Sequence, residues 1–281
     1  MFERFTRSLN LVRASASVLA QDTHLLVFPL CSGVAFLMVA ACFLLPLFGL
    51  GGFDALEQGE VGRAPVYAFA FAFYVVQYVV IFYFNTALVG ATMIRLDGGV
   101  PTIGDGLRVA NARFGTILGY AVIAATVGMV LRMIQERVGF VGKWIAGLLG
   151  AGWTVATALV VPVLVARDVG PVEAVRDSAV LLKRTWGENV IGNVGMGLAF
   201  TVLHLALGLG GVALILGAAY LHSMVLVALL VAALVILILG SVLVHAALGG
   251  IYSAALYRYA VHGEAAGGFG NAALQSAFRS K

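Results

Sequence analysis

Few side chains in this sequence are suited to catalysis or ligand binding, and those few lie inside long apolar runs. His204, Ser241 and His245 are the clearest of them. Ser241 and His245 are four residues apart, so on a helix they share a face, as a nucleophile and its base would. A nucleophilic site needs a third group to orient the base, and the runs supply none. The sequence therefore predicts no catalytic residue.

The two histidines also raise the question of a haem. If the last two runs form an antiparallel hairpin that turns near Tyr220, His204 lies 16 residues and His245 lies 25 residues from the turn. At 1.5 Å per residue their depths differ by about 13 Å. Two axial ligands of one haem need nearly the same depth, so we expect no shared haem. Each histidine is expected to hydrogen-bond to a neighbouring helix.

Other polar groups lie in or at the edges of the apolar runs. Gln77, Asn85 and Asn193 are expected to hydrogen-bond between helices, as His204 and His245 are, although polar side chains of this kind also line substrate pathways. Acidic and basic residues are absent from the middle of every run. This absence argues against a proton-coupled pump or ion transporter, and we predict that the protein is not an enzyme.

The two cysteines, Cys31 and Cys42, lie in one apolar run. Eleven residues of helix separate them by about 16 Å, whereas a disulfide needs Cα atoms within about 7 Å. No histidine or carboxylate stands at ligand spacing beside either cysteine. We therefore predict no disulfide between them, no metal site and no cofactor.

The composition explains why polar groups are so scarce. The chain has 281 residues, of which 62% are hydrophobic and 11% are charged, and its mean hydropathy is +1.03. Soluble domains have about 45–50% apolar residues, so lipid is the natural solvent for this excess. Six apolar runs are long enough to cross the hydrocarbon core as helices. We predict an all-α polytopic membrane protein whose spans are 25–50, 66–94, 115–135, 144–166, 190–218 and 223–256.

The connections between the runs alternate in charge. All but four of the 17 lysines and arginines lie before the first run, after the second, after the fourth or after the last; the exceptions are Arg63, Arg132, Arg137 and Lys143. By the positive-inside rule both termini are cytoplasmic, in the inner membrane of a bacterium or archaeon. The basic residues stand in short loops and form no stripe on a soluble surface, so we predict no nucleic-acid binding.

One connection is long enough to form a helix of its own. From residue 171 to 186 the apolar residues recur at spacings of three and four, starting with a proline at the first helical position. The segment is too polar to cross the membrane and is joined to a span at each end. We predict a helix that lies in the membrane interface on the cytoplasmic side, with Trp186 in the aromatic belt.

The same pattern predicts two more interfacial helices, over residues 1–22 and 103–114. The first has no continuous apolar core before a cleavage site, so we expect it to be retained rather than removed as a signal peptide. The residues predicted to contact the membrane interface or a docked partner are Val172, Val175, Leu182, Lys183, Arg184, Trp186, Phe2, Phe5 and Arg7.

These elements suggest a single membrane domain over residues 1–281. After the helix at 1–22 come a helical hairpin at 25–94, an interfacial helix with a hairpin at 101–166, another such pair at 171–256, and a cytoplasmic tail at 257–281. The entries into two interfacial helices, "RLDGGVP" and "RDVGP", are alike. This likeness indicates an internal repeat. It is explained equally well by the need of every cytoplasmic loop for arginine, glycine and a helix start.

Three segments carry a family resemblance: "FTRSLNLVRASASVLAQDTHLLVFPLCS", "PVEAVRDSAVLLKRTWGENVIGN" and "ALYRYAVHGEAAGGFGNAALQSAFRSK". With them the chain resembles an uncharacterised group of six-helix prokaryotic integral membrane proteins, classed as a domain of unknown function. The resemblance covers the whole chain. It implies an integral membrane fold and assigns no activity.

Two functions are compatible with these features. The first is a non-enzymatic scaffold or accessory subunit of a membrane complex, which needs no buried charge and offers interfacial helices for docking. The second is a carrier or remodeller of lipids or other hydrophobic molecules, which also needs no charged site. Membrane lipids are the expected partners in either case, and other membrane proteins in the first.

Overall fold

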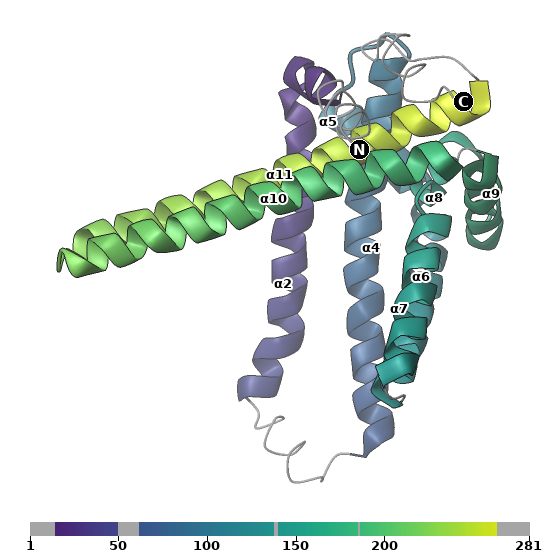
Figure 1. The fold of residues 1–281 in the computed structure, drawn as a ribbon. Helices are drawn as coiled ribbons and strands as arrows, with labels where there is room; N and C mark the ends of the chain where they lie inside the picture. The colour runs from purple at the N-terminus through teal and green to yellow at the C-terminus, as the bar shows by residue number, and fades with distance from the viewer. Residues whose placement is uncertain (1–14, 50–61, 138–139, 185, 263–281) are drawn as a thin grey trace. The chain divides into compact units, whose positions relative to one another are not determined.

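The structure is a computed structural model that describes residues 15–49, 62–137, 140–184 and 186–262 (Figure 1). The described residues form helices, turns and short connections, and none of them is in a strand. The predicted all-α fold is confirmed.

Six helical stretches among the described residues are long and apolar enough to cross a membrane. They correspond to the six predicted runs with ends that differ by a few residues, and they give the chain the architecture of a multi-pass membrane protein. The stretches are Thr23–Leu47, Ala64–Leu96, Phe114–Glu136, Gly142–Ala166, Gly195–Tyr220 and Met224–Arg258.

The chain divides into two compact units. We call Val27–Arg184 the bundle unit, and Met1–Leu26 together with Thr185–Lys281 the hairpin unit. Each is described by itself below.

In the bundle unit the long helix α4 (Arg63–Leu96) packs against α2 (Val27–Gly49) and α6 (Phe114–Arg137). Aromatic rings make these contacts. Phe43 of α2 lies 5.3 Å from the ring of Phe69 on α4, and Phe82 of α4 lies 4.5 Å from the ring of Tyr120 on α6. Such rings fill the space between apolar spans without a charged group.

The fourth predicted span is divided into two helices, α7 (Phe140–Ala156) and α8 (Val160–Ala166). Residues 157–159 between them form turns. Pro162 explains the break, because it has no N–H to donate to the carbonyl four residues earlier and its ring clashes there. It stands in the first turn of α8, where a proline is tolerated.

Two short amphipathic helices complete the bundle unit: α5 (Ile103–Ala112) and α9 (Pro171–Arg184). Both begin where the sequence predicted. The helix predicted for residues 171–186 corresponds to α9, which ends at Arg184, two residues before the predicted end. Trp186 is the first residue of the next helix. Trp186 therefore does not belong to α9. Figure 1 shows α9 beside α8 rather than continuing its axis, and α9 also contacts α6 and α7.

The hairpin unit contains α10 (Trp186–Tyr220) and α11 (Met224–His262), which pack against each other. They are joined by a turn in which His222 has a φ of 55°. Because α11 continues to His262, the first residues of the predicted tail are helical.

The N-terminal part of this unit is described from residue 15. Residues 15–21 are helical and are followed by the short helix η1 (Thr23–Leu26). The rest of the predicted helix at residues 1–22 lies outside the described residues.

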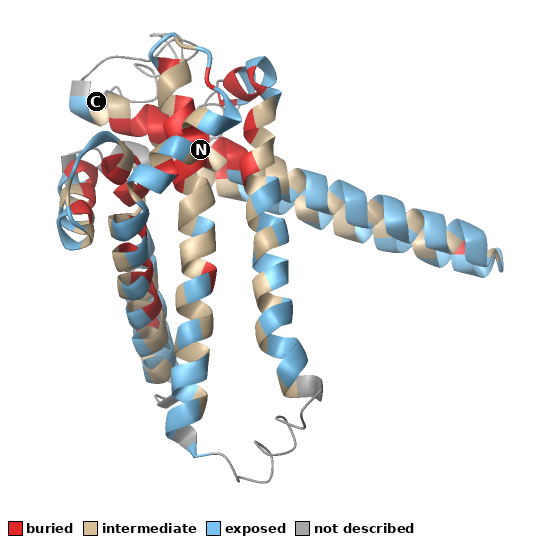
Figure 2. Cartoon of the chain, turned by 180° about the vertical axis from the view of Figure 1, so that it is seen from behind, coloured by how far each residue is buried: buried red, intermediate tan, exposed pale blue. Residues whose placement is uncertain are grey.

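Much of the hairpin of α10 and α11 is exposed (Figure 2), and many of its exposed residues are large and apolar. Leu209 is 66% exposed on α10, and Ile236 is 69% exposed on α11. A soluble protein would not leave so continuous an apolar surface in water. These side chains are suited to contact with lipid or with other membrane helices.

Candidate interfacial helices and the polar cluster of the hairpin

Small residues hold α5 tightly against the spans. A Cβ atom at Gly106 would lie 2.6 Å from both the Ala87 carbonyl oxygen of α4 and the Phe28 ring of α2, and one at Gly90 would lie 2.9 Å from the Val109 side chain. No larger residue fits at position 106 without moving the backbone of α4. The position of α5 is therefore fixed by close contact, as at other helix interfaces in membranes.

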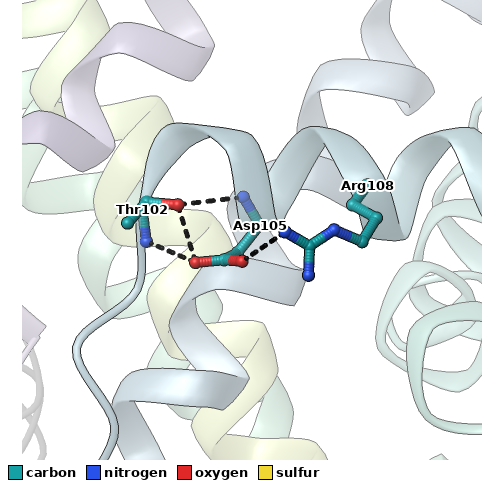
Figure 3. A network of polar contacts seen from close by, with 3 residues as sticks. All are labelled: Thr102, Asp105 and Arg108. Carbon is teal, nitrogen blue, oxygen red and sulfur yellow. Dashed lines mark hydrogen bonds and ion pairs between the residues drawn. The ribbon is translucent and has the colours of Figure 1, made fainter.

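The first turn of α5 is closed by a capping box (Figure 3). The Thr102 hydroxyl donates to Oδ2 of Asp105 at 2.6 Å, and the Asp105 N–H donates to that hydroxyl at 3.1 Å. Arg108 contacts the other carboxylate oxygen at 3.1 Å. The hydrogen bonds from the Thr102 hydroxyl and N–H, helped by the Arg108 charge, hold the pKa of Asp105 below its usual 3.8.

The end of α5 is tied down by two further contacts. The Tyr83 hydroxyl of α4 donates to the Asn111 side-chain oxygen at 2.7 Å. Arg113, which follows α5, forms an ion pair with Asp168 in the connection before α9. The second contact links the two amphipathic segments, although 55 residues separate the partners.

The packed face of α9 differs from the predicted apolar stripe. Ala174, Ser178 and Leu181 are buried, with at most 8% exposed, whereas Val172 of the predicted stripe is 71% exposed. Among the members of that stripe whose side chains the structure describes, Leu182 is buried, and Val175 and Ala179, which also belongs to the stripe, are half-buried. Ala174 and Ser178 let the helices approach closely because their side chains are small. The buried leucines Leu181 and Leu182 flank them, and Val172 and Val175 lie on an adjoining outer strip.

Ser178 completes the hydrogen bonding of the broken span. Its hydroxyl donates to the Ala156 carbonyl at 2.7 Å and accepts from the Leu159 N–H at 3.1 Å. The break before Pro162 leaves these two backbone groups without a helical partner. Irregular backbone at membrane depth is tolerated only where its polar groups are satisfied within protein, and Ser178 meets that requirement from α9.

A neighbouring pair of residues connects the end of α8 to both amphipathic helices. Arg167 donates to the Asp177 carboxylate on α9 at 2.7 Å, and the next residue, Asp168, pairs with Arg113 after α5. Close packing adds a third constraint, because a Cβ atom at Gly119 of α6 would lie 2.8 Å from the ring of Pro171. The start of α9 is thus fixed against α6.

Counted from their first residues, α5 and α9 use the same positions in the same way. The third residue is acidic, the fourth and eighth are small and buried, and the sixth is an exposed arginine. The pairs, in that order, are Asp105 and Glu173, Gly106 and Ala174, Ala110 and Ser178, and Arg108 and Arg176. The internal repeat itself stays a prediction.

In the hairpin unit, His204 of α10 and Ser241 of α11 form a hydrogen bond, with Nε2 and Oγ 2.8 Å apart. The Ser241 hydroxyl donates its one proton to the Ile238 carbonyl at 2.8 Å. His204 must therefore be the donor, with its proton on Nε2. In this arrangement the histidine does not act as a base toward Ser241, and the bond joins two helices as the sequence predicted.

His245 stacks on Phe200 of α10, with ring centroids 4.3 Å apart and an interplanar angle of 7°. The predicted depth difference between the histidines was wrong. Since His204 faces Ser241 and His245 lies one helical turn further along α11, the two differ by about 6 Å. The cause is that the turn follows Tyr220 instead of being centred on it. Among the described residues no group of three or more His, Cys, Asp or Glu side chains is arranged to hold a metal ion.

The remaining predicted packing residues lie on α4 and α10. Gln77 is 4% exposed, and its Nε2 donates to the Phe36 carbonyl of α2 at 3.2 Å, whereas its Oε1 has no hydrogen-bond partner among the described residues. Asn85 is half-buried on α4. Asn193 lies on α10. Gln77 thus joins two helices as predicted.

Several predicted interface residues are only partly described. Lys183 is exposed near the end of α9. Phe2, Phe5 and Arg7 lie outside the described residues. The side chains of Arg184, Trp186 and Asn193 lie outside the described part of the structure as well, although their helices are given.

The sequence interpretation missed Ser178 and the pair Arg167 and Asp168. Pro162 inside an apolar run was a signal for the helix break whose free backbone groups Ser178 binds. The ion pairs had no comparable signal, because the partners of Arg167 and Asp168 lie 10 and 55 residues away.

The chain was compared with known proteins. No curated protein and no solved structure matches it. A family described as "Family of unknown function (DUF6159)" matches residues 64–269, which is more than half of the chain. The match includes both amphipathic helices of the bundle unit and the hairpin of α10 and α11. The chain therefore belongs to this family of unknown function, DUF6159.

Proposed function

We propose that the protein is a non-enzymatic scaffold or accessory subunit of a membrane complex. We place it in the cytoplasmic membrane of a bacterium or archaeon, with both termini and the amphipathic helices α5 and α9 on the cytoplasmic side. The observation that carries the proposal is a face of small residues on α10 that is open in the hairpin unit.

This small face consists of Ala206, Gly210, Ala213 and Gly217, at spacings of four, three and four, and all four residues are exposed. It is distinct from the contact with α11, where a Cβ atom at Gly211 would lie 2.6 Å from the Leu234 side chain. A Cβ atom at Gly210 or Gly217 would meet nothing within 4 Å.

A small face of this kind fits a transmembrane helix of another protein. In lipid there is no hydrophobic driving force between helices, so association depends on close backbone approach, which small residues allow. The leucines beside the face are more than 60% exposed at positions 205, 209 and 214 and would pack at the sides of the incoming helix.

Several polar groups of the spans and of α9 are engaged in ways that support a non-enzymatic role. Gln77, Ser178 and His204 each hydrogen-bond to another helix or to its backbone, and Ser241 gives its proton to a carbonyl of its own helix. Groups engaged in this way hold helices together and are not poised for proton transfer or nucleophilic attack.

The alternative function, a carrier or remodeller of lipids, would be favoured by an open groove lined with Gln77 or Asn85. Gln77 is instead enclosed, with 4% of its surface exposed and a bond to α2. This enclosure supports the scaffold over the carrier.

The test is retention of a partner by the full-length protein, purified in mild detergent from its own membrane. We expect one membrane protein to co-purify at constant stoichiometry with the wild type and to be lost from Gly210→Leu, because the leucine fills the small face. Gly240→Leu is the matched control, since Gly240 is an exposed glycine on α11 with nothing near its Cβ position. Retention by both variants, or loss from both, would contradict the proposal.

A further inference from the structure

The outer edge of α9 carries two basic side chains that have no ion-pair partner among the described residues. Arg176 and Lys183 are both exposed. They are seven residues apart, which is close to two helical turns, so they lie on one edge of the helix. The acidic residue nearest to this edge along the helix surface is Glu173, whereas Asp177 is engaged by Arg167.

The residue types of α9 follow a fixed order around the helix, at about 100° per residue. The packed face comes first, then an outer apolar strip, then the basic edge, and last an acidic strip that leads back to the packed face. In this order the residues are Ala174 and Ser178; Val175, Ala179 and Val172; Lys183 and Arg176; and Glu173 and Asp177. The exposed Val180 lies between the basic edge and the acidic strip, and by its position in the sequence Arg184 falls within the acidic strip.

This order matches the layers of a membrane surface. An apolar strip turned toward the acyl chains places the edge beside it at the depth of the lipid phosphates. Long basic side chains reach that depth while their stems stay along apolar surface. Carboxylates placed further round the helix then point toward water, away from the phosphates. An arrangement with the acidic strip beside the apolar one would instead repel the phosphate layer.

The helix α5 repeats the order independently. Its packed face of Gly106 and Ala110 is followed by an apolar strip of Ile103 and Leu107, then by Arg108 and then by Asp105. The Arg108 side chain is 80% exposed. Its pairing with Asp105 weakens its charge, so α9 has the stronger basic edge.

From this order of layers we propose that the basic edge of α9, formed by Arg176 and Lys183, binds the phosphate headgroups of anionic phospholipids. The inference rests on the interfacial position of α9 that the proposed function includes. It adds a ligand class and the two side chains that hold it. It does not depend on the partner helix at the small face of α10.

The test uses full-length protein in detergent micelles doped with equal amounts of phosphatidylglycerol and phosphatidylcholine. The lipid retained after gel filtration is quantified, and its ratio is the readout. One basic residue near an anionic surface corresponds to about fivefold in lipid affinity. We expect the wild type to retain phosphatidylglycerol preferentially, Lys183→Gln to lose about fivefold of this preference, and Arg176→Gln with Lys183→Gln to lose nearly all of it.

Two controls make the result specific. Lys143→Gln removes an exposed lysine in the first turn of α7 and should leave the ratio of retained lipids unchanged. The exchange of Arg176→Lys with Lys183→Arg keeps both charges and should keep the preference. All variants must elute and melt like the wild type. We expect this because the side chains of Arg176, Lys183 and Lys143 are exposed.

A double variant that keeps the wild-type preference would overturn the proposal, as would an equal loss from Lys143→Gln. A wild-type protein with no preference for phosphatidylglycerol would overturn it too. None of these outcomes involves the co-purifying partner, so a negative result here leaves the scaffold proposal to its own test.

Discussion

The hydrogen bonds of Ser178 give the clearest quantitative prediction about the bundle unit. In Ser178→Ala the Leu159 N–H and the Ala156 carbonyl both lose their hydrogen-bond partner, the Ser178 hydroxyl at 3.1 Å and 2.7 Å. Leu159 and position 178 are fully buried, so water cannot replace the hydroxyl easily. The substitution leaves one donor and one acceptor unsatisfied.

Two general magnitudes compete at this site. Hydrogen bonds between side chains of membrane helices contribute about 0.6 kcal/mol on average, because the unfolded chain in the membrane finds other partners. A buried group left unsatisfied costs about 1–3 kcal/mol. Here the second effect decides, since Pro162 prevents the two backbone groups from pairing within a continuous helix. We therefore expect Ser178→Ala to lower the free energy of unfolding by about 2 kcal/mol or more.

The assay is reversible unfolding in mixed micelles as the fraction of denaturing detergent rises, followed by loss of helical circular dichroism. Ser253→Ala is the matched control, because the Ser253 hydroxyl donates at 2.9 Å to the Gly250 carbonyl of its own helix. That variant should stay within about 0.5 kcal/mol of the wild type. The reasoning is refuted if Ser178→Ala is as stable as Ser253→Ala.

Gly119→Ala should destabilise the bundle unit and displace the start of α9, because its Cβ atom would lie 2.8 Å from the ring of Pro171. Gly115→Ala is the control and should be neutral, because a Cβ atom there meets nothing within 4 Å. Equal melting temperatures of the two variants would contradict this prediction. The lowered pKa of Asp105 means that its bonds to Thr102 stabilise the start of α5 above the unfolded pKa and are lost as pH falls through the lower folded value. Hydrogen exchange in the first turn of α5, corrected for intrinsic rates, should accelerate only below pH 3.8, and Asp105→Asn should remove this transition; an unchanged profile would argue against the cap. After replacement of both native cysteines, Glu57→Cys should react with an impermeant reagent from outside the cell, and labelling from the cytoplasmic side would reverse the proposed orientation.

The spans were predictable because their signal is physical and local. An apolar run of about 20 residues has few alternatives to a membrane helix, and the six runs correspond to the six helical stretches of the structure. The starts of α5 and α9 were predictable for a similar reason. Proline is common at the first position of a helix, as Pro171 is in α9, and the spacing of Thr102 and Asp105 is typical of a capping box at a helix start.

The packed faces were not predictable from the apolar pattern alone. That pattern assigned the valines of α9 to one contact face, but Ala174 and Ser178 form the buried seam. In membranes close contact is made by small residues, which an apolar stripe does not single out. The helix α5 follows the same rule with Gly106 and Ala110.

The hairpin shows how a small error in the predicted position of a turn changes the predicted depths of His204 and His245 in the membrane. The turn at residues 221–223 follows Tyr220, which shortens the distance to His245 and lengthens the distance to His204. The predicted depth difference of about 13 Å falls to about 6 Å at 1.5 Å per residue. The partner of His204, the Ser241 hydroxyl on the other helix, follows from this corrected register.

The central claim is that the protein acts by holding another membrane protein at the small face of α10. The most direct measurement places a photoreactive amino acid at Ala206, on that face, and in a separate variant at Val235, which is 49% exposed on α11. Crosslinking is carried out in native membranes, and the adducts are identified by mass spectrometry. The account predicts a discrete adduct with one other membrane protein from position 206 and none from position 235. Adducts from position 206 that contain only lipid, or only this chain itself, would contradict it.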